Sequence, residues 1–226
     1  MKTQQLDFYA LTHSPHILIS GVTGSGKSTL IHSLISAILE QGGDIGLIDP
    51  KRIELSPYKG LARFYAQDLN KVKSWLDGTI EYIDKLYSDM EKNGYRERCP
   101  YRHLFIIIDE LADLMVQDKK GISARLQRIT QLGRACNVHV IAATQAPDRT
   151  YTLPAPLKLN FTDRIALRCS DAIESKQIIG QKGAEVLPKN GFCIWKSPME
   201  IDVYSIPYVS DLEITRTVNK YSRLRA

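Results

Sequence analysis

The stretch "GVTGSGKSTL", residues 21–30, decides the fold. It fits the pattern G-x-x-x-x-G-K-[ST], follows an apolar run at residues 16–20 that we expect to form a buried strand, and opens a helical pattern at residues 27–41. In this context glycines let successive backbone N–H groups turn inward around a polyanion, and the helix N-terminus adds partial positive charge. We therefore expect a phosphate-binding loop. A merely flexible glycine-rich loop is the alternative, and the flanking elements disfavour it.

The residues of this expected loop have separate roles. Lys27 would reach the β- and γ-phosphates of a nucleotide, and the Ser28 hydroxyl would hold Mg²⁺. Gly24 and Gly26 would matter for the shape of the backbone rather than for chemistry. The residues expected to bind the nucleotide are Gly21, Val22, Thr23, Gly24, Ser25, Gly26, Lys27, Ser28 and Thr29.

Further candidate residues for metal binding and catalysis lie at the ends of two apolar runs. Such runs are typical of strands that are covered on both faces. Asp109 and Glu110 end the stretch "LFIIIDE". The Asp109 carboxylate could hold the Mg²⁺ shell through water, and Glu110 could polarise an attacking water as general base. Gln145 ends a later expected strand, "VIAATQ", where its neutral amide could sense the γ-phosphate and orient water. An ordinary polar residue at a strand end is the alternative for Gln145.

Strand patterns alternate with helical patterns along the chain, which predicts a parallel sheet. Two late runs, "GFCIW" and "IDVYSI", resemble a closing hairpin pair, and Ser210 with Glu213 forms a capping box for a last helix. We expect one α/β domain over residues 1–226, with its core at residues 14–206 and a helix at residues 210–224. The expected architecture is a three-layer P-loop fold with a mainly parallel central sheet and a C-terminal antiparallel extension.

Composition bounds the class of protein. The chain has 226 residues, of which 43% are hydrophobic and 24% charged, as in an ordinary globular domain. We expect neither a transmembrane segment nor a signal peptide, and therefore a cytoplasmic location.

The four cysteines form no CxxC pair and the histidines form no HExxH pattern, which disfavours disulfides and a zinc site. We expect His139, inside a strand pattern, to be a core histidine. The net charge of +5 permits nucleic-acid binding without requiring it.

Several classes of nucleotide-binding protein are disfavoured by missing motifs. The chain has no [NT]KxD motif for reading guanine and no LSGGQ-like transporter signature. It holds one nucleotide-binding core rather than the tandem pair of a monomeric helicase. A small-molecule kinase stays open, although it would not usually need an Asp-Glu pair followed by a strand that ends in glutamine.

Six stretches of this sequence resemble the FtsK/SpoIIIE family of double-stranded DNA translocases, within the wider FtsK–HerA group. The resemblance covers roughly residues 16–195. Its most specific parts are "LIDPKRIELSPYKG" and "GAEVLPKNG", supported by "PHILISGVTGSGKS", "IIIDELADLM", "RACNVHVIAATQAP" and "NFTDRIALR". We expect Asp49 and Lys51, in the first of these, either to border the nucleotide or to belong to a turn that Pro50 fixes.

The resemblance implies a RecA-like ATPase that works as a hexameric ring, with DNA in the central pore and ATP between neighbouring subunits. Hydrolysis in such a ring needs a positive charge from the adjacent subunit, an arginine finger. The position that matches the family is Arg134. The alternative is a helix-end arginine that meets exposed carbonyl groups.

The chain departs from the family where pore contacts are expected. Ala146 follows Gln145 where the family often has arginine, and Ala172 stands where lysine is common. Arg149 and Lys176 lie nearby and are the candidate DNA-binding residues. The pore therefore looks less basic than usual, which matters because phosphate contacts carry most non-specific affinity for DNA.

The expected function is an ATP- and Mg²⁺-dependent motor that moves double-stranded DNA in plasmid, phage or conjugative transfer or segregation. Its expected partners are DNA, further copies of the chain in a ring, and a membrane-bound or relaxase-type protein. Larger family members carry membrane helices and DNA-reading domains that do not fit here, so the chain resembles a motor core alone. The alternatives are an ATP-binding switch that recruits a partner with little hydrolysis, or a packaging or single-strand-pumping ATPase.

Overall fold

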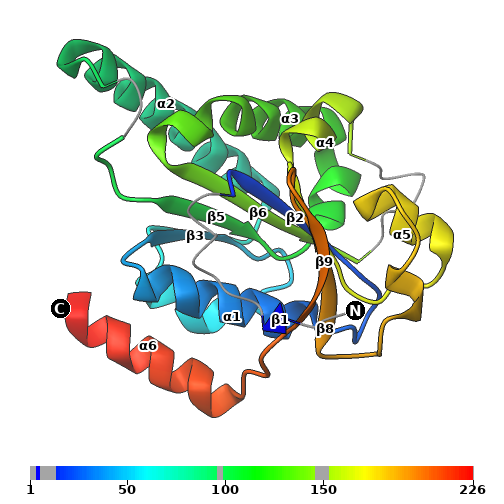
Figure 1. The fold of residues 1–226 in the computed structure, drawn as a ribbon. Coiled ribbons are helices and arrows are strands. Elements are labelled where there is room, and N and C mark those ends of the chain that lie inside the picture. Colours follow the sequence, from blue (N-terminus) through cyan, green and yellow to red (C-terminus); the bar gives the residue numbers. More distant parts are fainter. Residues whose placement is uncertain (1–3, 6–13, 96–98, 146–152, 226) are drawn as a thin grey trace.

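The computed structural model describes residues 4–5, 14–95, 99–145 and 153–225. A central sheet lies between two groups of helices, so the fold has three layers (Figure 1). The strands are β1 Gln4–Gln5, β2 His16–Ser20, β3 Asp44–Ile48, β4 Phe64–Ala66, β5 Leu104–Ile108, β6 Val138–Thr144, β7 Asp163–Ala166, β8 Phe192–Lys196 and β9 Ile201–Ser205. Among the described residues, the sheet has nine strands in the order β1-β9-β8-β7-β2-β6-β5-β3-β4.

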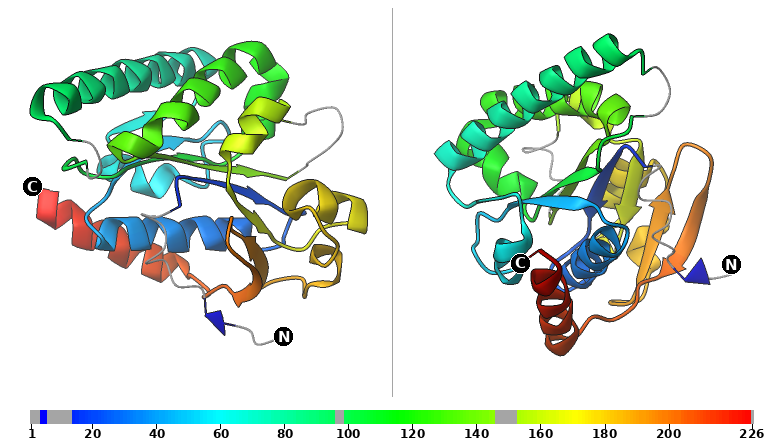
Figure 2. Two further views of the ribbon diagram at one scale, coloured as in Figure 1. Left: turned by 45° about the horizontal axis from the view of Figure 1, so that its top comes forward. Right: turned by 90° about the vertical axis from the view of Figure 1, so that its left-hand side faces the viewer.

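Helices connect these strands and cover both faces of the sheet. They are α1 Lys27–Glu40, α2 Leu69–Asn93, α3 Leu111–Leu132, α4 Ala155–Asn160, α5 Ala172–Ile179 and α6 Asp211–Arg225, with 3₁₀ turns η2 Ser56–Leu61, η3 Gly133–Cys136 and η4 Ala184–Val186. The left view of Figure 2 shows α2 and α3 on one side of the sheet and α1 and α6 on the other. No helix in the described ranges is both long and apolar enough to cross a membrane.

The period-two alternation of strand side chains builds one hydrophobic core on each face of the sheet. In β5, Phe105 and Ile107 pack in the core on the α1 side, whereas Leu104, Ile106 and Ile108 pack in the core under α2 and α3. All five are nearly inaccessible to solvent. This two-sided burial explains why β5 is a continuous apolar run rather than an alternating one.

The strand order places the loops that carry the candidate site residues at one edge of the sheet, where the parallel strands have their carboxyl ends. β6 pairs in parallel with β2 on one side and with β5 on the other. The carboxyl ends of these three strands therefore lie next to one another, and the loops that leave them are adjacent. β3 pairs in parallel with the far side of β5 and ends at the same edge.

The expected fold is confirmed, including the antiparallel extension, because β8 pairs antiparallel with both β7 and β9. The predicted capping box is present: Ser210 N–H donates to Glu213 Oε2 at 2.7 Å, and Glu213 N–H donates to Ser210 Oγ at 3.3 Å. The short strands β1 and β4 were not predicted. They extend the sheet by parallel pairing with β9 and β3.

Candidate active site

The glycine-rich loop after β2 has the geometry of a phosphate cradle. Gly24 and Gly26 have φ angles of 74° and 96°, in the left-handed region that glycine adopts most readily. The loop is held from behind, because Val22 N–H donates to Arg168 O at 2.9 Å. Lys27 Nζ folds back and donates to Gly21 O at 2.7 Å. The sequence-predicted loop therefore exists as a defined turn with its lysine close by.

The N-terminus of α1 is left open for an anion. Its N-cap residue is Gly26, no side chain caps the first turn, and no acidic residue lies in that turn. The first N–H groups of a helix need a partner and carry partial positive charge. Beside them the Ser25 hydroxyl is buried without a hydrogen-bond partner among the described residues. These unsatisfied donors fit a bound phosphate.

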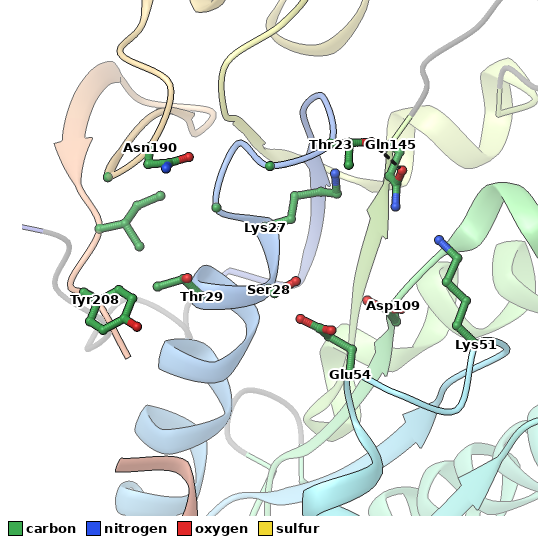
Figure 3. A pocket seen from close by; sticks show the side chains of 14 residues that line it. Thr23, Lys27, Ser28, Thr29, Lys51, Glu54, Asp109, Gln145, Asn190 and Tyr208 are labelled. Carbon is green, nitrogen blue, oxygen red and sulfur yellow. Dashed lines mark hydrogen bonds between the residues drawn. The ribbon is translucent and has the colours of Figure 1, made fainter. Parts of the chain in front are cut away.

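A cavity of about 570 Å³ opens in front of the loop. Figure 3 shows Lys27 and Lys51 approaching its centre from opposite sides. Tyr208 and Asn190 lie at the end of the cavity away from Lys51, on the same side as Thr29. The cavity is lined by Thr23, Gly24, Gly26, Lys27, Ser28, Thr29, Lys51, Glu54, Asp109, Gln145, Asn190, Gly191, Ile206 and Tyr208.

The acidic side of the cavity suits a divalent cation. Burial raises the pKa of Asp109 to about 6, and the carboxylates of Asp49, Glu54 and Glu110 act in the same direction. Carboxylates crowded in this way favour a positive charge between them. Ser28 and Asp109 both line the cavity, and Mg²⁺ is usually held by one or two protein oxygens together with water and substrate phosphates. The residues present therefore fit Mg²⁺.

Glu110 lies behind the cavity wall. Its side chain is only 4% exposed, and it does not belong to the lining. Its Oε1 accepts a hydrogen bond from Gln145 N–H at 3.2 Å, and its Oε2 lies 3.5 Å from Lys51 Nζ. Both oxygens of Glu110 thus have partners.

The lysine of the phosphate loop interacts with both acidic residues. Burial lowers the pKa of Lys27, while the charges of Glu110 and Asp109 act in the opposite direction.

Gln145 links the phosphate loop to Glu110. The Thr23 hydroxyl donates to Gln145 Oε1 at 2.9 Å, while the backbone of Gln145 contacts Glu110. Since β6 lies between β2 and β5, Gln145, the residue directly after β6, falls between the loop and the acidic pair. This is the position that a residue sensing the γ-phosphate would need.

The loop after β3 brings two further charged residues to the cavity. Asp49 is fully buried and accepts hydrogen bonds from Arg52 N–H at 2.8 Å, from Leu55 N–H at 3.2 Å and from the Tyr65 hydroxyl at 3.0 Å. It therefore shapes the loop and does not line the cavity. Lys51 does line it, and so does Glu54. Of the two residues whose place the sequence left open, one is structural and the other faces the site.

Arg134 lies at the opposite end of β6 from Gln145. It is exposed in η3, directly before β6 begins, and its charge affects His16 at the start of β2. The seven residues of β6 separate Arg134 from Gln145 by about 23 Å, so Arg134 cannot reach the cavity of its own chain. Lys176 is exposed on α5, away from the cavity lining. Arg149 lies outside the described residues.

Sequence reasoning missed the part of the site built by distant segments. Asn190 and Gly191 precede β8, and the Asn190 side-chain amide lies against the Gly24 carbonyl. Ile206 and Tyr208 follow β9. Only the pairing of β8 and β9 beside β7 brings these segments to the loop. Glu54 could have been found, because it follows the carboxyl end of a parallel strand.

The chain is similar in sequence to a known family. The model of the FtsK/SpoIIIE family matches residues 5–103 and 96–149. The DNA translocase FtsK of Tropheryma whipplei is 34% identical over 80% of this chain and 28% of its own length. The DNA translocase FtsK of Leptospira interrogans is 33% identical over 93% of this chain and 25% of its own length. The chain thus spans about a quarter of the length of these relatives.

Solved structures share the fold. The pCW3 conjugation coupling protein TcpA, solved with ATPγS, has a TM-score of 0.85 at 24% identity, over 96% of this chain and 66% of that one. The cytoplasmic domain of the type VII secretion ATPase EccC of Thermomonospora curvata has a TM-score of 0.73 at 22% identity, over 91% of this chain and 28% of that one. The architecture is that of the RecA-like P-loop ATPases. With the sequence match over most of its length, the chain belongs to the FtsK/SpoIIIE family.

Proposed function

We propose that this chain is a Mg²⁺-dependent ATPase that moves double-stranded DNA in the cytoplasm as a ring of identical subunits. The observation that carries the proposal is the meeting of three elements at one edge of the sheet. The phosphate loop, Asp109 and Gln145 line one cavity, and Glu110 lies directly behind it. This set of groups is the one that phosphoryl transfer to water requires.

The residues divide the work as follows. Lys27 and the first-turn N–H groups of α1 bind the phosphates. Ser28 and Asp109 would hold Mg²⁺, which when bound neutralises phosphate charge. Glu110 takes a proton from water as the water oxygen bonds to the γ-phosphorus. The bond from that phosphorus to the β–γ bridging oxygen breaks, and ADP and phosphate leave.

The ring is supported by the position of Arg134. Arg134 is exposed at the end of β6 opposite Gln145. It cannot reach the cavity of its own chain, but it could contact the cavity of a neighbouring subunit. An arginine supplied by the adjacent subunit stabilises charge that develops on the phosphates and can contribute about 10³-fold or more to the rate. Hydrolysis would then occur only where two subunits meet.

The DNA substrate is supported by the relatives, which are named DNA translocases. Lys176 is the candidate contact among the described residues, and Arg149 stays a prediction from the sequence. A membrane-bound or relaxase-type protein would recruit the ring to its DNA.

The proposal is tested by the steady-state ATPase rate of the 226-residue chain, without DNA, with single strands and with duplex. We expect stimulation by duplex, a hexamer mass in the presence of a non-hydrolysable nucleotide, and a Glu110→Gln variant that binds ATP but loses about 10²-fold or more in turnover. Equal rates with and without DNA would count against a DNA motor. Normal hydrolysis by Glu110→Gln would remove Glu110 as the base.

A further inference from the structure

The Glu110 carboxylate is held away from any substrate. It lies behind the lining of the cavity, with Oε1 bound to Gln145 N–H and Oε2 facing the ammonium group of Lys51. A general base must reach the proton that it abstracts, directly or through one water. An ammonium group beside the carboxylate also competes with a water proton for the same oxygen. In this arrangement Glu110 is not ready to act.

Lys51 is held loosely enough to change partners. Its ammonium nitrogen is 3.5 Å from Glu110 Oε2 and 4.0 Å from Asp113 Oδ2, both longer than the roughly 2.8 Å of a tight charge-assisted hydrogen bond. The side chain is 40% exposed and lines the cavity, opposite Lys27. A lysine has a long flexible stem and a compact charge, so it can turn without moving the backbone.

The backbone beneath Lys51 is fixed. Asp49, two residues before Lys51, accepts hydrogen bonds from the N–H groups of Arg52 and Leu55, which follow Lys51, and the Tyr65 hydroxyl donates to the same carboxylate. These hydrogen bonds restrain the backbone of the loop next to Lys51. Any change of partner is confined to the side chain.

We propose that Lys51 is a positioning residue that restrains Glu110 until the γ-phosphate of a nucleoside triphosphate draws its ammonium group into the cavity. The inference rests on the proposed function, because it needs a triphosphate in this cavity. The γ-phosphate carries more negative charge than one carboxylate and would lie beside Lys27, within the same space. When Lys51 turns to it, Gln145 N–H still holds Glu110 Oε1, and Oε2 is free to accept a proton from water.

If Lys51 restrains Glu110 in this way, two effects on nucleotide affinity are expected. Lys51→Met should lower the preference for Mg²⁺-AMP-PNP over Mg²⁺-ADP about tenfold, since only the former has a γ-phosphate. Glu110→Gln should tighten AMP-PNP binding several-fold, because Lys51 no longer has to leave a carboxylate. That tightening should vanish in the Lys51→Met background, so the two effects are coupled.

The experiment is a double-mutant cycle measured by calorimetry on the whole chain, with both nucleotides. Lys51→Arg, which keeps the charge, should restore most of the triphosphate preference. Lys85→Met is the matched control, because Lys85 is an exposed lysine on α2 that does not line the cavity. It should leave both affinities unchanged.

The outcomes separate the two proposals. A wild-type chain that binds no Mg²⁺-nucleotide overturns the proposed function and this inference together. A wild-type chain that binds both nucleotides, with additive effects of Lys51→Met and Glu110→Gln, overturns this inference alone. An equal loss of AMP-PNP and ADP affinity in Lys51→Met would do the same, since it would mean a general effect on the cavity.

Discussion

The Thr23 hydroxyl donates a 2.9 Å hydrogen bond to Gln145 Oε1 and so joins the phosphate loop to the end of β6. The backbone N–H of the same glutamine contacts Glu110. Thr23, in the expected phosphate loop, is thus two contacts away from the proposed base. A change in the phosphate loop can therefore reach the carboxylate that we propose as the base through groups that are already in contact.

Replacing Thr23 tests this connection. Thr23→Val keeps the shape but removes the hydroxyl, so Gln145 loses one orienting bond. We expect kcat to fall about five- to tenfold with little change in KM for ATP, the effect of one hydrogen bond. Thr23→Ser keeps the hydroxyl and should retain most of the activity. Wild-type kcat in Thr23→Val would show that this bond has no role in turnover.

The loop after β3 should depend on Asp49 for its stability. Asp49→Ala removes the carboxylate that accepts from Leu55 N–H and the Tyr65 hydroxyl, and it removes one of the two acceptors of Arg52 N–H, so it should lower the free energy of unfolding by about 2–4 kcal/mol. Tyr65→Phe removes one hydrogen bond to the same carboxylate and should cost about 1 kcal/mol. Denaturant unfolding measures both changes. If Tyr65→Phe destabilised the chain more than Asp49→Ala, the carboxylate would not be the centre of the loop.

Two buried histidines, near the amino ends of β2 and β6, should make stability depend on pH. Burial lowers the pKa of His16 to about 3 and that of His139 to about 4. His139 Nδ1 donates to the Ser14 or Pro15 carbonyl, and its Nε2 accepts from His103. The prediction of a core histidine from the sequence is confirmed.

The two histidines should contribute a loss of stability as the pH decreases from about 6.5 to about 4, which the raised pKa of Asp109 partly opposes below about pH 6. In this window the unfolded chain binds protons at these histidines, whereas the folded chain keeps them neutral. Each such histidine contributes up to about 1.4 kcal/mol per pH unit. His139→Gln should therefore show a shallower slope of unfolding free energy against pH than the wild type. An unchanged slope would mean that His139 is protonated in the folded state.

The sequence predicted the elements that local pattern controls. The phosphate loop, the strand that ends at Asp109, and the capped last helix are each specified by neighbours a few residues apart. The position of Gln145 between the loop and Glu110 follows from the strand order, which the sequence analysis did not predict. Tyr208 and Asn190 could not be predicted, because their place at the cavity depends on pairing between strands far apart in the chain. Lys51 stayed open because only three-dimensional structure shows which carboxylate it faces.

In the proposed ring, hydrolysis needs Glu110 of one subunit and Arg134 of the next. Arg134→Ala and Glu110→Gln chains should each be nearly inactive alone. Mixed in equal amounts with duplex DNA, they form some interfaces where the first variant supplies Glu110 and the second supplies Arg134. We predict that ATPase activity reappears in the mixture. A mixture as inactive as its components, or full activity of Arg134→Ala alone, would contradict the claim.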